Sequence, residues 1–142
     1  MKTLKQLLQA KPHGILSVAP DARVFDALGL MAEQNVGALL VMEAGRLTGI
    51  ITERDYARKV ILKGKSSLDT PVREIMTDKV LCAHPDQSIE ECMALMTDKR
   101  VRHLPVMDGN QLLGVLSIGD LVKEVISEQQ FMIKQLESYI HR

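Results

Sequence analysis

The sequence is poor in aromatic residues and carries no excess of either charge. It has no tryptophan, two tyrosines and two phenylalanines, so aromatic residues make up 3% of its 142 residues. Proteins that hold single-stranded nucleic acid stack its bases on aromatic side chains, which are scarce here. Lysine plus arginine equals aspartate plus glutamate at 18 each, so no overall positive field attracts a phosphate backbone. We therefore expect a globular protein with an aliphatic core and no nucleic-acid partner.

Cysteine and histidine are too few and too scattered for a metal site. The cysteines, Cys82 and Cys92, form no CxxC pair, and the four histidines show no His-x-x-x-His spacing. We expect both cysteines to be free, buried thiols in a reducing compartment. The segment Gly64-Lys65-Ser66 is similar to the end of a phosphate-binding loop, but the first glycine of that loop would fall at Lys59. The sequence thus indicates no catalysis, no metal and no required cofactor.

Long apolar runs are missing as well. Residues 1–10 alternate polar residues with Leu4, Leu7 and Leu8, a pattern too short and too polar for a signal peptide or a membrane span. We expect a cytoplasmic protein without a membrane partner.

The chain contains two copies of one unit. Residues 15–61 align with residues 80–126 at an offset of 65 without a gap, and 14 of these 47 positions are identical. Both copies carry a Pro-Asp turn, aliphatic positions at matching places, and a Gly-to-Asp motif near the end. An internal duplication of this length predicts two structural repeats.

Each copy shows the pattern of a βαββα unit. A short apolar run, 15–18 or 80–83, predicts a strand, and apolar residues at helical spacing follow it. Two further apolar runs around a turn predict a β-hairpin, and a second helix begins at Thr52 or Ser117. We expect a mixed α/β fold of two repeats packed about a pseudo-twofold axis, since one such unit buries few side chains alone.

This pattern divides the chain into five parts. They are an N-terminal helical lead-in (1–14), repeat 1 (15–61), a connector (62–79), repeat 2 (80–126) and a C-terminal helix extension (127–142). In the connector, Thr70-Pro71 is typical of a helix start and predicts a short helix through Met76. Apolar residues near heptad spacing predict that the last helix runs from Leu121 to about His141.

The strongest local signal is the motif Gly, two aliphatics, a hydroxyl, two variable residues and Asp, at 49–55 and again at 114–120. One interpretation is a helix cap, in which Thr52 or Ser117 exchanges hydrogen bonds with the aspartate three residues on. The other is a nucleotide site. A helix N-terminus with a hydroxyl suits a phosphate, and a carboxylate one turn later can accept both hydroxyls of a ribose. Ile50 and Val115 would then line the base, and the two interpretations are compatible.

With these features together, the sequence resembles a tandem pair of CBS domains, the cystathionine-β-synthase type of regulatory module. The resemblance rests on the Pro-Asp turns at 20–21 and 85–86, the strands at 36–41 and 101–106, and the two Gly-to-Asp motifs. It implies binding of AMP, ADP, ATP and sometimes NAD(H) or S-adenosylmethionine in clefts between the repeats, and pairing into disc-shaped dimers. By this resemblance Asp55 and Asp120 hold ribose hydroxyls, and Thr52 and Ser117 lie beside phosphate.

The two prospective sites differ in charge. Arg102 and His103 precede the second motif, where repeat 1 has Gly37 and Ala38. The family often places basic residues there, close to phosphate, so the Ser117/Asp120 site is the better candidate for AMP; a solvated basic face is the alternative. In repeat 1, Arg54 is either a phosphate contact or a surface residue.

Two weaker candidates complete the first site. Thr77 stands where the family's linker borders a site and is otherwise an ordinary turn residue, and Ala38 takes the position that His103 has in repeat 2.

Two functions remain open. The first is a non-enzymatic sensor of adenine nucleotides that forms a homodimer and signals to a regulated partner protein. Its C-terminal helix either contacts a second copy, which we favour, or folds back onto its own domain or docks another protein. The second is a structural dimerisation module whose motifs are only helix caps and which binds no nucleotide.

Overall fold

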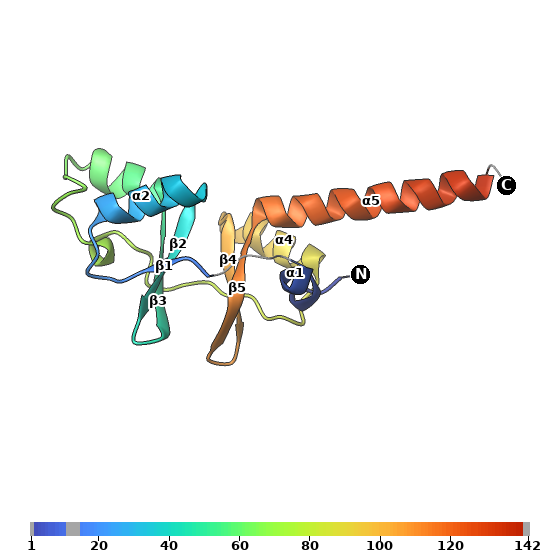
Figure 1. Ribbon diagram of the computed structural model, residues 1–142, viewed down its shortest axis with the longest axis horizontal. Helices are drawn as coiled ribbons and strands as arrows, with labels where there is room; N and C mark the ends of the chain where they lie inside the picture. Colours follow the sequence, from blue (N-terminus) through green and yellow to red (C-terminus); the bar gives the residue numbers. More distant parts are fainter. Residues whose placement is uncertain (1, 11–14, 141–142) are drawn as a thin grey trace. The chain divides into compact units, whose positions relative to one another are not determined.

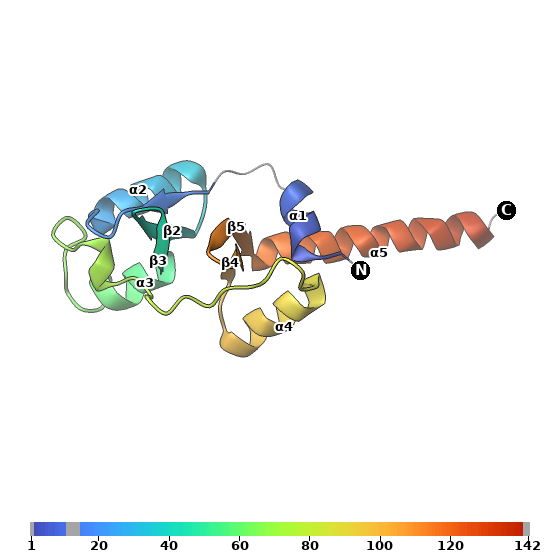
Figure 2. The ribbon, with the colours of Figure 1, turned by 90° about the horizontal axis from the view of Figure 1, so that it is seen from below.

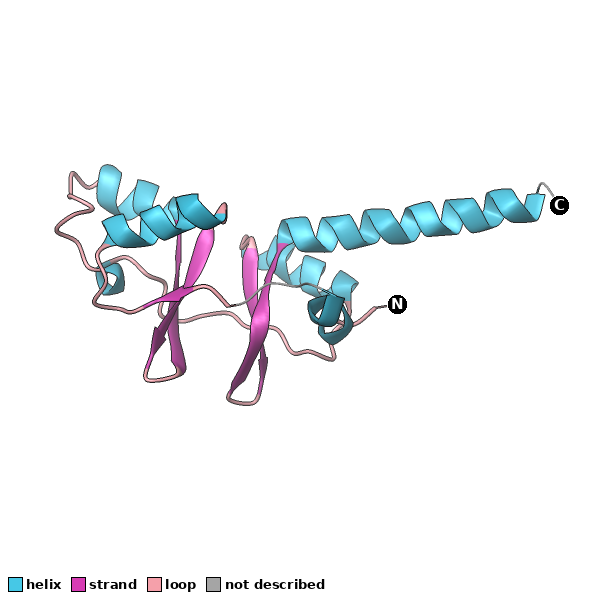
Figure 3. Ribbon diagram, viewed as in Figure 1, coloured by secondary structure: helices cyan, strands magenta, loops and turns pink. Residues whose placement is uncertain are grey.

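The computed structural model describes residues 2–10 and 15–140 and divides them into two compact units (Figure 1). One unit comprises residues 15–81, and the other joins the described N-terminal residues to residues 82–140. Each holds one of the two repeats, with a β-hairpin and helices beside it (Figure 3). The mixed α/β fold with two repeats is therefore confirmed. Among the described helices, none has the length and apolar character needed to cross a bilayer.

The unit of residues 15–81 contains the predicted elements of repeat 1. Its sheet has the order β1-β2-β3, in which β1 is parallel to β2 and β2 is antiparallel to β3. The elements are β1 (Ser17–Val18), α2 (Val24–Gln34), β2 (Ala38–Glu43), β3 (Arg46–Thr52), α3 (Glu53–Tyr56), the π-helix η1 (Ala57–Ile61) and the 3₁₀-helix η2 (Val72–Glu74). Their aliphatic faces form one core that includes Val24, Met31, Ile51 and Val60. The second helix of this repeat thus begins as predicted and then widens into π geometry, where the Leu62 amide donates to the Ala57 carbonyl (3.1 Å).

The other unit contains repeat 2. Its elements are α1 (Leu4–Ala10), α4 (Ile89–Lys99), β4 (His103–Asp108), β5 (Gln111–Ser117) and α5 (Ile118–Ile140). The strands β4 and β5 form an antiparallel hairpin. The long C-terminal helix is confirmed up to Ile140, and its expected end at His141 lies outside the described residues.

The predicted strand at 80–83 is wrong, because repeat 2 keeps only a single bridge there. Ala83 pairs with Val106, its amide donating to the Pro105 carbonyl (2.8 Å) and its carbonyl accepting from the Met107 amide (2.9 Å). In repeat 1 the Leu40 amide donates to the Leu16 carbonyl (3.2 Å) and extends the ladder by one bond. The corresponding residue in repeat 2 is Pro105, which has no N–H to donate. Because repeat 2 has Pro105 where repeat 1 has Leu40, its sheet has one strand fewer than that of repeat 1.

The predicted helix start at Thr70-Pro71 is also wrong in detail. The Thr70 hydroxyl donates back to the Ser66 carbonyl (2.7 Å) and caps nothing, while Pro71 precedes a single 3₁₀ turn at η2. Two residues of this segment, Val72 and Ile75, are buried in the core of repeat 1. The connector therefore serves as part of the core of its unit rather than as a free linker.

The N-terminal helix packs on repeat 2, which follows it by some 80 residues in the sequence. The Leu4 amide donates to the Gln87 carbonyl (2.9 Å), and the Lys5 amide donates to the Pro85 carbonyl (3.0 Å). Helix α1 lies against β5 (Figure 2), and its residues Leu4 and Leu7 are buried. The lead-in predicted for 1–14 is helical at Leu4–Ala10, and its residues 11–14 lie outside the described part.

The glycine that opens each Gly-to-Asp motif lies where another segment passes close to the strand. A Cβ on Gly49 would lie 2.7 Å from Met76 Sδ and 3.0 Å from the Thr77 carbonyl oxygen, both in the connector. A Cβ on Gly114 would lie 2.8 Å from Leu8 Cδ2 in α1. Equivalent glycines in the two repeats thus admit covering segments from different parts of the chain.

These contacts predict an order of stability for three glycine variants. Gly49→Ala should lower the free energy of unfolding by about 1–3 kcal/mol, because backbone as well as a side chain must move. Gly114→Ala should cost less, since the Leu8 side chain can rotate away. The control Gly29→Ala, with no atom within 4 Å of the added Cβ in helix α2, should raise stability by about 0.5–1 kcal/mol. Urea denaturation measures all three, and equal costs at Gly49 and Gly114 would contradict the predicted order.

Candidate functional site

The first Gly-to-Asp motif ends a strand and starts a helix through reciprocal hydrogen bonds. The Thr52 amide donates to Asp55 Oδ2 (3.0 Å), and the Asp55 amide donates to Thr52 Oγ1 (3.1 Å). The Thr52 hydroxyl also donates to Asp55 Oδ2 (3.1 Å). This is the capping box that the spacing predicts, and it fixes the positions of both side chains.

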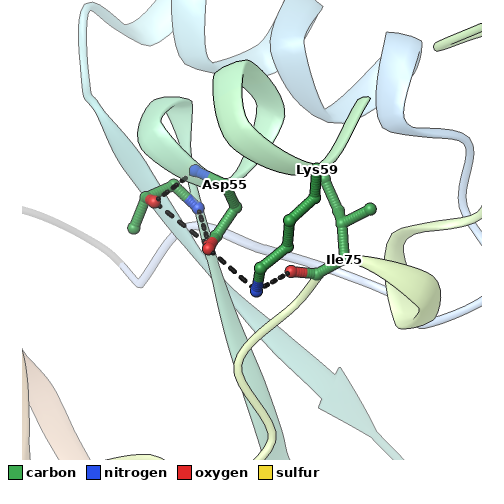
Figure 4. A network of polar contacts seen from close by, with 4 residues as sticks. Asp55, Lys59 and Ile75 are labelled. Carbon is green, nitrogen blue, oxygen red and sulfur yellow. Dashed lines mark hydrogen bonds and ion pairs between the residues drawn. The ribbon is translucent and has the colours of Figure 1, made fainter. Parts of the chain in front are cut away.

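A lysine one turn later occupies the other oxygen of this carboxylate. Lys59 Nζ lies 3.2 Å from Asp55 Oδ1 and donates to the Ile75 carbonyl in the connector (2.9 Å), as Figure 4 shows. The Asp55 side chain is largely buried, with 13% of it exposed. Both oxygens of Asp55 are thus engaged by groups of its own unit.

Three further predicted residues lie beside this pair. Ala38 on β2 is paired directly with Thr52 on β3. Ile50 exchanges backbone hydrogen bonds with Thr77, its amide donating over 3.0 Å and its carbonyl accepting over 2.9 Å. Arg54 lies on the first turn of α3 and is exposed. We call this group the first motif site: Ala38, Ile50, Thr52, Arg54, Asp55 and Thr77.

The second Gly-to-Asp motif repeats the cap with serine. The Ser117 amide donates to Asp120 Oδ2 (2.8 Å), and the Asp120 amide donates to Ser117 Oγ (3.1 Å). Because α5 is a continuous helix of 23 residues, this cap stands at the positive end of a full helix dipole.

The basic residues predicted for this site lie next to the cap. His103 on β4 is paired directly with Ser117 on β5, and the Ile118 amide donates to the Arg102 carbonyl (2.9 Å). Arg102 is exposed, whereas His103 and Val115 are half-buried. We call this group the second motif site: Arg102, His103, Val115, Ser117 and Asp120. Every predicted site residue therefore lies in one of two groups, each within a single unit.

The neighbouring basic residues have other roles in the fold. Arg100 adopts the left-handed conformation (φ 56°) that ends helix α4, and Lys99 lies 3.9 Å from Asp98 on that helix. These positions agree with the alternative of a solvated helix end.

Sequence reasoning missed Lys59 and its counterpart. The residue of repeat 2 that corresponds to Lys59 is Glu124. It forms an ion pair with Lys2 (2.6 Å). Lys59 could have been found, because an Asp and a Lys four residues apart face each other on a helix. The Lys2–Glu124 pair could not have been predicted from the sequence, because its two residues lie far apart in the chain.

The two cysteines and a surface hollow are not part of either motif site. Cys92 is buried and Cys82 half-buried, and burial raises the pKa of Cys82 and raises that of Cys92 to about 11. A hollow of about 530 Å³ is lined by seven residues, none of them in a motif site: Cys82, Ala83, His84, Asp86, Gln87, Glu91 and Met107. In the described part of the chain, no group of three or more His, Cys, Asp or Glu side chains could hold a metal ion.

Comparison with known proteins places these features in a family. The model of the CBS domain matches residues 12–62 and 72–127. The mitochondrial CBS domain-containing protein CBSX3 of Arabidopsis thaliana is 44% identical over 125 residues, which cover 84% of this chain and 61% of that protein. The CBS domain-containing protein YhcV of Bacillus subtilis is 35% identical over 115 residues, 81% of either chain.

Solved structures agree with the fold. A protein with CBS domains from Burkholderia ambifaria MC40-6 has 55% sequence identity and a TM-score of 0.87, over 90% of this chain and 96% of that one. The CBS domain pair of protein MJ0100, solved with 5'-methylthioadenosine and S-adenosyl-L-methionine, has 22% identity and a TM-score of 0.79, over 90% of this chain and 98% of that one. At that identity the likeness shows the fold alone.

The raised thiol pKa values predict slow modification of the folded protein. The thiolate is the reactive form, and at pH 8 a pKa of about 11 leaves about one molecule in a thousand ionised at Cys92. Ellman's reagent should therefore react slowly with Cys92 in the Cys82→Ser variant and rapidly once urea unfolds it. The rate for the folded protein should rise about tenfold per pH unit between 8 and 10. A fast reaction at pH 8 without unfolding would show that Cys92 is neither buried nor raised in pKa.

Proposed function

The chain belongs to the CBS domain family, and we propose on that premise that it binds an adenosine-containing ligand and signals to a partner chain. As a CBS domain pair it is a regulatory, non-catalytic module. We propose AMP as the ligand, with ADP, ATP and NAD(H) as the other candidates. The observation that carries the proposal is the Ser117–Asp120 cap beside Arg102 and His103, all held within one unit.

The second motif site has the groups that a nucleoside phosphate requires. The Asp120 carboxylate can accept hydrogen bonds from the two hydroxyls of a ribose, because a carboxylate has about four acceptor positions. The Ser117 hydroxyl and the helix N-terminus favour a phosphate. The Arg102 side chain supplies charge-assisted donors, which favour a nucleotide over a nucleoside. Val115, half-buried on β5, is suited to contact the base.

The first motif site has the same cap, but its Asp55 carboxylate is less available to the hydroxyls of a ribose. Lys59 already neutralises Asp55 and is itself held by the Ile75 carbonyl. A ribose hydroxyl would have to displace this lysine, whereas the corresponding residue of repeat 2, Glu124, pairs with Lys2 instead. Arg102 and His103 lie beside the Ser117–Asp120 cap, where repeat 1 has Gly37 and Ala38. Because they add donors for phosphate, we propose that the Ser117/Asp120 site binds first and more tightly.

The ligand class is supported by a relative. The CBS domain pair of protein MJ0100 was solved with two adenosyl compounds, which share the ribose and adenine that the motif sites would contact. The groups beyond the ribose differ between AMP, NAD(H) and S-adenosylmethionine, and Arg102 and His103 favour those that carry phosphate.

The signal would reach another chain through a shift between two conformations. A ligand that favours one state changes the affinity for a partner by its differential binding energy, typically about 1–3 kcal/mol. We propose a homodimer and a regulated protein as the partners. A cytoplasmic location stays a prediction, since the Arabidopsis relative is mitochondrial.

The first test is a thermal-shift panel of AMP, ADP, ATP, NAD, NADH and S-adenosylmethionine with GMP as control. A ligand at about 100 times its Kd stabilises the folded state by about 2.7 kcal/mol and should raise the Tm. Asp120→Asn keeps a cap oxygen but loses the charge, so it should weaken AMP binding by about 10- to 150-fold without a large loss of stability. No shift with any adenosine compound, on a folded protein, would favour the structural dimerisation module.

A second test addresses Lys59 in the Asp120→Asn background, where the first motif site dominates binding. Lys59→Met frees the Asp55 carboxylate and should tighten adenosine binding about two- to fivefold, the value of a partly exposed ion pair. Adenosine is used because it lacks a phosphate, which the lysine would attract. The control is Lys63→Met, because Lys63 is exposed and follows Lys59 by four residues. Equal affinities in titration calorimetry for the two variants would remove Asp55 from the proposed site.

A further inference from the structure

Helix α5 carries an uncovered apolar stripe along its whole length. The stripe consists of six positions: Val122, Ile126, Gln129, Ile133, Leu136 and Ile140. At 3.6 residues per turn these lie within about 40° of one line along the helix. The five apolar members are 41% to 73% exposed, whereas the buried residue Leu121 faces the domain on another side of the helix.

The stripe continues beyond the domain. All residues from 129 to 140 are exposed, and this half of α5 extends away from α1 and α4 of its own unit (Figure 1). A helical segment of about a dozen residues is only marginally stable in water without packing. A second surface is therefore needed to cover this half of the helix.

The spacing of the stripe is that of a coiled coil. Its intervals alternate between four and three residues, which assigns Ile126, Ile133 and Ile140 to heptad position a, and Val122, Gln129 and Leu136 to position d. The flanking positions are unequal. Position g is apolar throughout, with Val125, Met132 and Tyr139, whereas position e holds Lys123, Gln130 and Glu137.

We propose that α5 pairs with α5 of a second copy of this chain in antiparallel orientation. In an antiparallel pair a faces d, and three layers then form with one register: Val122 with Ile140 of the second copy, Ile126 with its Leu136, and Gln129 with its Ile133. Each layer occurs twice, so the whole stripe of both helices is covered.

The charges select this orientation. Antiparallel pairing places position e against e, which sets Lys123 opposite Glu137 of the second copy on both sides of the dimer. It also places g against g, so that Met132 meets Met132 and Val125 meets Tyr139. Parallel pairing would set Lys123 and Glu137 against the apolar residues of position g. The helix is thus complementary to itself only when reversed.

The stripe is tested first by its contribution to self-association. Analytical ultracentrifugation should find the unmodified chain associated, and Ile133→Asp should weaken that association by about 100-fold or more, since a charge enters two layers. The matched control is Phe131→Asp on the opposite face of α5. Phe131 is somewhat more exposed, at 64% against 53% for Ile133, and its variant should associate like the unmodified chain. The proposal would be overturned if the unmodified chain were a monomer, or if the two variants weakened association equally. The stripe would then be a surface for another protein.

The orientation is tested by exchanging the two charges between copies. Lys123→Glu alone and Glu137→Lys alone each place like charges opposite in a homodimer, whereas a mixture of the two single variants restores both ion pairs in the heterodimer. With one variant tagged, native mass spectrometry should show the ratio of heterodimer to the two homodimers together raised several-fold above its statistical value of about one. A statistical mixture would overturn the antiparallel register even if Ile133→Asp dissociates the protein. Neither experiment depends on bound nucleotide, so each stands apart from the test of the proposed function.

Discussion

Each hairpin of this protein needs a covering segment from outside its own βαββ run. A segment passes over the middle of the second strand of each hairpin, at Gly49 or Gly114, where a side chain would leave no room. In one unit this segment is the connector, which contributes Val72 and Ile75 to the core. In the other it is the N-terminal helix, with Leu4 and Leu7 buried. The two repeats therefore depend on segments that are unrelated in sequence.

The same two strands end at the candidate sites. A strand that stops at Thr52 or Ser117 leaves free amides at the start of the next helix, and the aspartate three residues on satisfies one of them and orients the hydroxyl. The helix cap and the candidate binding site are therefore one arrangement, which is why the sequence allowed both interpretations. What separates the sites is the residue one turn later: Lys59 binds Asp55 in repeat 1, whereas Glu124 in repeat 2 binds Lys2.

Helix α5 carries both the second candidate site and the proposed dimer interface. Its first turn carries the Ser117–Asp120 cap, and the turns from Val122 to Ile140 carry the stripe proposed to pair with a second copy. A ligand at the cap and a partner at the stripe would thus act on one rigid element, and a shift of the first turn would move the whole interface. This continuity would give the proposed ligand a direct mechanical path to the proposed partner.

Local patterns in the sequence were enough to predict the duplication, the two hairpins, both caps and the long C-terminal helix. These features depend on hydrophobic period, turn residues and spacings of three or four residues, which all lie within a short stretch of chain. Prediction failed where the outcome depended on a partner across the fold. The strand at 80–83 required a donor that Pro105 lacks, and Thr70 bonded back to Ser66 instead of capping η2. The packing of α1 on repeat 2 and the reach of Lys59 to the Ile75 carbonyl emerged only from the folded chain, because such contacts join residues whose proximity no local pattern encodes.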